Sequence, residues 1–133
     1  MTGVLVLGDT FGMEPAAARH AHHVAFTPVA PTRRLDTRAG ARLAAGSITS
    51  VATGVPAGAS AVFINITTTD AGTPGYVTAD RCDALAGGPQ TKSNGNYAPR
   101  IDTSNTSIVP IGADGSLCIY NEMPVHLLVD VQG

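Results

Sequence analysis

The chain has 133 residues, of which 44% are apolar and only 14% charged, with a formal net charge of −2. This length predicts one domain with a sizeable core. The weakly charged, nearly neutral composition suits neither a nucleic-acid-binding protein nor a basic protein of membrane surfaces. No apolar run approaches the roughly 20 residues of a membrane span. The 15 Gly and 9 Pro are typical of a protein made of many turns.

Residues 1–25 differ from the rest of the chain, and we expect them to form an extended docking arm. No Lys or Arg precedes the apolar run in this arm, and the run is too short for a signal peptide. His20, His22 and His23 lie in the same arm without a Cys or clear carboxylate at ligand spacing, so no metal site is expected. The residues expected to dock on a partner are Val4, Leu5, Val6, Leu7 and Phe11.

The domain is expected to span residues 26–133 and to begin with an extended segment, because Pro28 and Pro31 disfavour helix. In an extended chain Asp36 and Arg38 share one face and can pair. Two interpretations follow. The pair is either a set of polar anchors in a ligand groove or a structural ion pair, and the structural role is the commoner one for such pairs.

Short strands at regular spacing predict the fold class. The clearest strand covers residues 61–67, where apolar residues alternate with others and mark the core face: Val62, Ile64 and Ile66. The last strand has the same alternation, with a core face made of Val125, Leu127, Val129 and Val131. Further strands are expected at 47–51, 76–79, 106–111 and 116–121. Many turns and no long helix predict an all-β, antiparallel, jelly-roll-like sandwich with an extended N-terminal arm; a barrel is the alternative.

Turn chemistry gives two further predictions. Residues 112–115 read Gly-Ala-Asp-Gly, which predicts a tight hairpin turn. Pro110 lacks a backbone N–H, so the strand that contains it should lie at a sheet edge or carry a bulge.

Residues 83–100 are expected to form a long irregular segment, either functional or mobile. Within it, residues 93–97 supply amide side chains and an aromatic ring, the groups that commonly bind sugars. The alternative is that these Asn and Gly residues simply make turns. The carbohydrate-binding candidates are Asp36, Arg38, Tyr76, Asn94, Asn96 and Tyr97.

The sequence lacks the motifs of common catalytic sites. No G-x-S-x-G motif, phosphate-binding glycine loop or zinc-ligand spacing is present. His126 and Asp130 share a face of the last strand and suggest an acid–base pair, although a satisfied histidine is the commoner outcome. Asp36 and Asp130 would be the paired carboxylates of a hydrolase, but the sequence does not set their distance. We therefore expect a non-enzyme without a cofactor.

The two cysteines, Cys82 and Cys118, leave two alternatives open. A secreted protein would pair them, and a cytosolic protein would keep them as thiols.

Eight stretches carry a family resemblance, and they cover about residues 26–133: 26–28, 34–38, 43–47, 54–67, 75–78, 93–97, 112–115 and 126–133. In this order they resemble a repeat-type module common in secreted and envelope-associated proteins of actinobacteria. The resemblance implies a lectin-like β-sandwich that serves as an accessory and carries no catalytic set. It also implies a Cys82–Cys118 disulfide, since the family tends to carry such a cysteine pair.

Two functions are expected from these observations. A start Met, no signal peptide, a single module and an apolar arm fit a decoration or tail-surface protein of an actinobacterial phage, docked on a capsid or tail protein. It would lie on the virion surface and could still contact host-envelope glycan. The alternative is a secreted or cell-envelope module that binds actinobacterial envelope polysaccharide. Homo-oligomer formation is left open.

Overall fold

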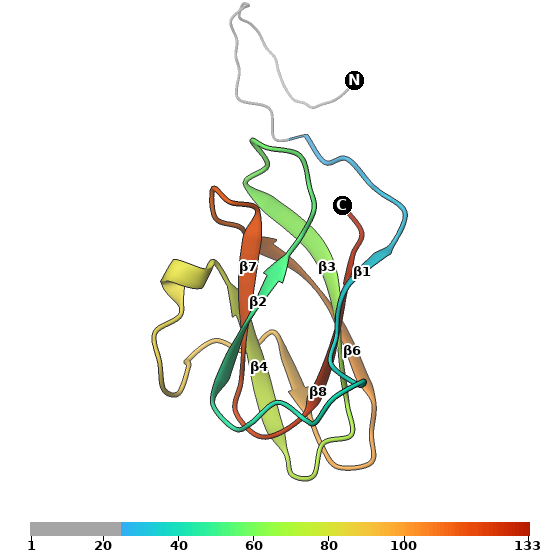
Figure 1. Ribbon diagram of the computed structural model, residues 1–133, viewed down its shortest axis with the longest axis vertical. Helices are drawn as coiled ribbons and strands as arrows, with labels where there is room; N and C mark the ends of the chain where they lie inside the picture. The colour runs from blue at the N-terminus through green and yellow to red at the C-terminus, as the bar shows by residue number, and fades with distance from the viewer. Residues whose placement is uncertain (1–24) are drawn as a thin grey trace, which may run out of the picture.

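The computed structural model describes residues 25–133, which form two antiparallel four-stranded sheets packed face to face (Figure 1). The strands are β1 Thr32–Asp36, β2 Ser47–Ala52, β3 Ala61–Thr69, β4 Gly75–Asp80, β5 Gly95–Tyr97, β6 Thr103–Pro110, β7 Ser116–Asn121 and β8 His126–Val131, with one 3-10 turn, η1, at Cys82–Ala84. One sheet has the order β1-β8-β3-β6, here called the open sheet. The other has the order β2-β7-β4-β5, here called the covered sheet.

The predicted antiparallel β-sandwich is confirmed. Most consecutive strands alternate between the two sheets, and the orders β1-β8-β3-β6 and β2-β7-β4-β5 are those of a jelly roll. Because the strands form two separate sheets, the barrel alternative is excluded for the described residues.

The core lies between the sheets and follows the predicted alternation. Every second residue of β3 is buried, and the intervening residues face outward. Both predicted core faces are confirmed, because alternation by two is a local property of an extended backbone. The largest fully buried side chains are Val51, Val62, Ile64, Ile66, Val77, Val109, Leu117, Ile119, Val125, Leu127, Val129 and Val131.

The turn at residues 112–115 forms, but the predicted hairpin is wrong. The Gly112 N–H donates to the Ser116 carbonyl at 3.0 Å, which closes the turn. The turn nevertheless joins β6 to β7, and these strands belong to different sheets. Turn chemistry sets a local reversal, whereas the partner of β6 is decided by its long pairing with β3. The edge position predicted from Pro110 is confirmed, because β6 is the last strand of the open sheet.

The segment after β4 is not a free loop. It lies over the outer face of the covered sheet, where Figure 1 shows it in yellow. The predicted disulfide is present and joins Cys82 in η1 to Cys118 on β7. The Tyr76 hydroxyl adds a second attachment, since it donates to the Gln90 carbonyl and accepts from the Gln90 N–H, both at 2.9 Å. As a result the outward-facing Tyr120 is only 3% exposed.

Residues 1–24 of the expected arm lie outside the part of the chain that the structure describes. The predicted docking residues Val4, Leu5, Val6, Leu7 and Phe11, like the three arm histidines, lie outside the described residues. Across residues 25–133, none of the helical structure has the length and apolar character needed to cross a bilayer. The same residues contain no cluster of three or more His, Cys, Asp or Glu side chains placed to hold a metal ion.

Candidate functional site

Tyr97, a candidate sugar-stacking residue, is a core residue. Its ring is only 4% exposed. Its hydroxyl donates to the Met123 carbonyl at 2.7 Å and accepts from the Met123 N–H at 2.9 Å. Burial raises the pKa of the Tyr97 hydroxyl above its ordinary value. A stacking platform needs an exposed ring face, and Tyr97 does not offer one.

The neighbouring candidates Asn94 and Asn96 also make local structure. The Asn94 side chain accepts from the Ala79 N–H at 2.8 Å and donates to the Ser107 hydroxyl at 3.3 Å, so it links β4 to β6. The Asn96 side chain is exposed and accepts from the Ser93 hydroxyl at 3.1 Å. Residues 95–97 form β5 instead of lying in an irregular loop, because they pair with β4. The turn-forming alternative therefore describes this segment better than a sugar-binding loop does.

The six carbohydrate-binding candidates are not brought together. Tyr76, Asn94, Asn96 and Tyr97 belong to the covered sheet and the segment attached to it, where their polar groups hold the fold. Asp36 and Arg38 lie at the end of β1 in the open sheet. This separation leaves the open sheet as the place to look for a site.

The outer face of the open sheet carries a row of hydrogen-bonding side chains that are half-buried or exposed, although the outward-facing His126 and Leu128 of β8 are buried. Ser104 and Thr106 on the edge strand β6 are exposed. The Thr67 and Ser104 hydroxyls are 2.8 Å apart and bond across β3 and β6. We call this row the polar face. It consists of Arg33, Asp36, Arg38, Asn65, Thr67, Thr69, Ser104, Thr106 and Asp130.

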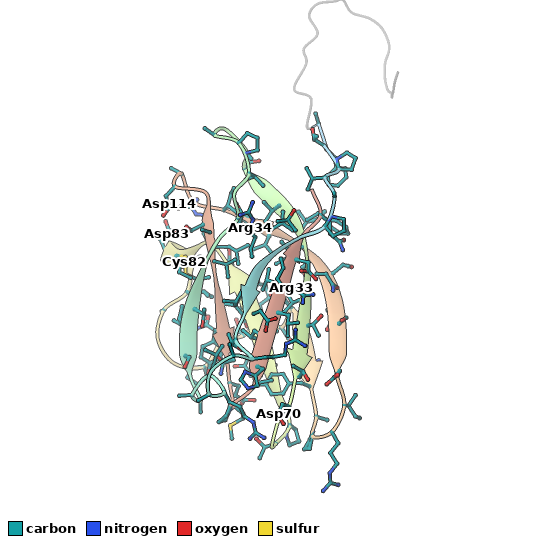
Figure 2. The ribbon with its side chains drawn as sticks, turned by 45° about the vertical axis from the view of Figure 1, so that its right-hand side comes forward. Arg33, Arg34, Asp70, Cys82, Asp83 and Asp114 are labelled. Carbon is teal, nitrogen blue, oxygen red and sulfur yellow. A yellow bond between two sulfur atoms is a disulfide. The ribbon has the colours of Figure 1, made fainter. Side chains whose placement is uncertain are left out.

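Four charged side chains occupy the β1 and β8 side of the polar face. Arg33 forms a bidentate ion pair with Asp130. Its Nε donates to Oδ1 at 2.8 Å, and its Nη2 donates to Oδ2 at 3.0 Å. Arg38 forms the same kind of pair with Asp36, at 3.0 and 2.8 Å. Arg33 Nη1 also lies 3.9 Å from Asp36 Oδ2, and this contact links the two ion pairs into one cluster. Figure 2 shows Arg33 beside β8, well away from Cys82 in η1.

The charged side chains of this cluster stabilise one another in their ionised forms. The side-chain and backbone hydrogen bonds from Arg38 lower the pKa of the Asp36 carboxyl to about 2. The expected Asp36–Arg38 ion pair is therefore present. It is not buried, however, because the Arg38 side chain is 54% exposed. The exposed guanidinium keeps donors available to a ligand.

Sequence reasoning missed Arg33, which is the centre of this cluster. It lies three residues before Asp36, but β1 bulges between Arg33 and Leu35, and the bulge determines which side chains face outward. Its pairing with Asp130 depends on β1 lying next to β8. The only signal in the sequence was a positive charge close to a predicted anchor.

The suggested acid–base pair does not form. His126 is largely buried, and its Nδ1 lies 2.9 Å from the Thr37 hydroxyl. Asp130 instead bonds to Arg33. His126 is thus the satisfied histidine that the alternative predicted. Asp36 and Asp130 do lie near each other, but only through the Arg33 guanidinium between them.

An apolar patch lies at the end of the sandwich where residue 25 enters. Phe26 is 59% exposed and packs edge-on against Phe63, with ring centroids 6.0 Å apart. Ile108 on the edge strand is 73% exposed. Two shallow cavities of about 400 and 350 Å³ adjoin this patch, and Phe26 lines both. We call Phe26, Phe63 and Ile108 the apolar patch.

Comparison with known proteins finds no family model that matches the chain and no curated protein whose sequence matches it.

Proposed function

We propose that the protein is a non-enzymatic binding module that works outside the cytoplasm and binds carbohydrate on its polar face. One observation carries the proposal: a disulfide-attached segment covers the outward-facing Tyr120 on β7 of the covered sheet, whereas every residue of the polar face on the open sheet is half-buried or exposed. The polar face therefore offers a broad polar surface to a ligand.

The chemistry of the polar face suits a polyhydroxylated ligand. Hydroxyl, amide, carboxylate and guanidinium groups supply both donors and acceptors, as sugar hydroxyls require. Many of these groups are already held by contacts such as Thr67 to Ser104 and Arg33 to Asp130. Groups held in place before binding lose less conformational entropy when a ligand arrives. The exposed ring of Phe26 at one end of the same sheet adds an apolar contact for a sugar ring.

The disulfide supports a location outside the cytoplasm, and the low pKa of Asp36 supports a non-enzymatic role. Disulfides persist in oxidising compartments, which favours a secreted or surface location. A general acid needs a raised pKa, whereas the pKa of Asp36 is about 2. The resemblance to actinobacterial envelope modules makes envelope arabinans and galactans the first ligands to examine.

A glycan array with these polysaccharides tests the proposal, using two exposed serines as a matched pair. Ser104 lies on the polar face, and Ser50 lies on β2 of the covered sheet. Ser104→Arg introduces a large side chain into the polar face and should abolish binding, while Ser50→Arg should bind like the wild type. Absence of binding at millimolar sugar, or equal loss in both variants, would refute the proposal.

A second candidate, a phage-particle surface protein, is favoured by the apolar patch. Exposed apolar patches mark protein interaction sites, and this patch adjoins residue 25, the last residue of the expected docking arm. In this function the arm residues Val4, Leu5, Val6, Leu7 and Phe11 and the patch together contact a capsid or tail protein.

Co-sedimentation with particles tests the second candidate. Deletion of residues 1–24 and the substitution Ile108→Ser should each release the protein from particles. Ile101→Ser is the matched control, because Ile101 is 58% exposed but does not belong to the apolar patch. Retention of the truncated protein on particles, or recovery of the full chain as a free secreted monomer, would contradict this role.

A further inference from the structure

We infer that a polar cavity at one end of the sandwich binds an acidic sugar residue, one that carries a carboxylate beside free hydroxyls. This inference rests on the proposed carbohydrate-binding function and makes its ligand more specific. The cavity has a volume of about 720 Å³, within the range of small-molecule sites. Figure 2 shows Asp70, one of its lining residues, at the lower end of the sandwich. The polar residues that line it are Arg42, Thr69, Asp70, Arg100 and Asp102.

Contacts between distant segments hold most of these residues in place. Arg42, between β1 and β2, donates two hydrogen bonds to Asp70 after β3, both at 3.2 Å. The Thr69 hydroxyl donates to Asp102 Oδ1 at 2.6 Å and so ties the end of β3 to the segment before β6. Because Thr69 also belongs to the polar face, the cavity lies at the end of that face and can take the terminal residue of a glycan bound along it.

The backbone around the cavity is unusual. Asp70 has φ +57° and Arg100 has φ +64°, and within residues 25–133 these are the two non-glycine residues with positive φ. Both line this cavity. The left-handed conformation is strained for a non-glycine residue, and residues held in strained conformations concentrate at functional sites.

The two arginines in the cavity differ in their partners. Arg42 is neutralised by Asp70. The Arg100 side chain, like that of Arg34, makes no hydrogen bond or ion pair within the described part of the chain, whereas Arg33, Arg38 and Arg81 each bond a carboxylate. An unpaired guanidinium group binds a planar carboxylate especially well, because the carboxylate accepts two parallel hydrogen bonds from it.

Asp102 in the cavity supplies an acceptor for a ligand hydroxyl. Asp102 uses Oδ1 for Thr69, and its Oδ2 has no partner among residues 25–133, so Oδ2 can accept a hydrogen bond from a ligand hydroxyl. The charges of Arg42, Arg100, Asp70 and Asp102 sum to zero, which disfavours a dianion such as phosphate next to two carboxylates. A monocarboxylate with neighbouring hydroxyls satisfies both Arg100 and Asp102. This is the chemistry of a uronic acid.

Titration of the full-length protein with glucuronate and galacturonate, followed by amide NMR shifts, tests this inference. Glucose, galactose and inorganic phosphate serve as comparison ligands. The two uronates should bind at least tenfold more tightly than the neutral sugars and should shift the amides of Thr69, Gly72 and Arg100. Arg100→Gly should remove this preference, and glycine accepts the left-handed conformation, so the variant should fold. Arg81→Ala, which removes another exposed arginine, should bind like the wild type.

The outcomes separate this inference from the proposed function. Equal binding of uronates and neutral sugars, or an unchanged uronate affinity in Arg100→Gly, would overturn the inference but leave glycan binding on the polar face intact. Phosphate binding as tight as uronate binding would show a general anion site and would also overturn it. Uronate binding that depends on Arg100, without glycan binding sensitive to Ser104→Arg, would keep the cavity as a site and refute the polar-face proposal.

Discussion

Tyr97 bonds both backbone groups of Met123: its hydroxyl donates to the carbonyl at 2.7 Å and accepts from the N–H at 2.9 Å. Met123 lies between β7 and β8, so this contact ties the edge strand β5 to the connection between the two sheets. The same ring lies directly over Gly75 on β4. Tyr97 is therefore a structural residue, and its neighbours can be tested as such.

Tyr97→Phe should lower the free energy of unfolding by about 1–3 kcal/mol, because it removes both hydrogen bonds to Met123: the Met123 N–H loses its partner, and the carbonyl keeps only the Asn121 amide at 3.1 Å. Urea denaturation followed by circular dichroism measures the change. Asn96→Ala, at an exposed position on the same strand, should stay within about 0.5 kcal/mol of the wild type. Equal stability of the two variants would contradict the structural role of the hydroxyl.

Gly75→Ala should destabilise the protein by about 1–3 kcal/mol, as is typical of overpacking. A Cβ at Gly75 would lie 2.6 Å from the Tyr97 ring, closer than packed atoms allow. Gly87→Ala is the control, because a Cβ there meets nothing within 4 Å and its φ is not positive. Calorimetry should show a lower melting temperature for the first variant alone. If Gly75→Ala has the same melting temperature as Gly87→Ala, the close approach of the Tyr97 ring to Gly75 is refuted.

Replacing both Cys82 and Cys118 with Ala should cost about 3–4 kcal/mol, the loop-closure entropy expected for a bridge between residues 36 positions apart. The attached segment should also loosen and expose Tyr120 to solvent. Urea midpoints with and without reductant measure the effect, and reductant should shift the wild type but not the double variant. Alkylation of the native protein should label no thiol. Two labelled thiols would show that the bridge is absent.

Acid should weaken the wild type partly through Asp36. The folded-state pKa of Asp36 is about 2, below the ordinary value of 3.8, so its stabilising contribution is present above pH 3.8 and is lost as the pH falls towards 2. Asp36→Asn should therefore be less stable than the wild type at pH 5 and should approach it at pH 2. Urea midpoints at pH 5, 4, 3 and 2 give this comparison.

Arg38→Gln provides the matched control for the cause of that shift. Hydrogen bonds from Arg38 are the largest contribution to the low pKa of Asp36. Without the guanidinium, the carboxyl titration followed by NMR should move up towards its ordinary value. An unchanged titration midpoint would assign the shift to another group and would argue against the ion pair.

Sequence alone determined the positions of most strands and their core faces. The alternation in residues 61–67 and 125–131 identified the core-facing residues of β3 and β8, because alternation is set by the extended backbone of each strand. Pro110 also placed β6 at an edge, because a missing N–H is a property of the residue itself.

Only the tertiary structure decided how the strands pair and which outer face is covered. Residues 112–115 looked like a hairpin turn but join two sheets, and residues 93–97 looked like a binding loop but contain β5 and the buried Tyr97. The pairing of Arg33 with Asp130 likewise joins residues 97 positions apart. Local preferences fix the conformation of a segment, whereas its partners and exposure depend on contacts with segments far away in the chain.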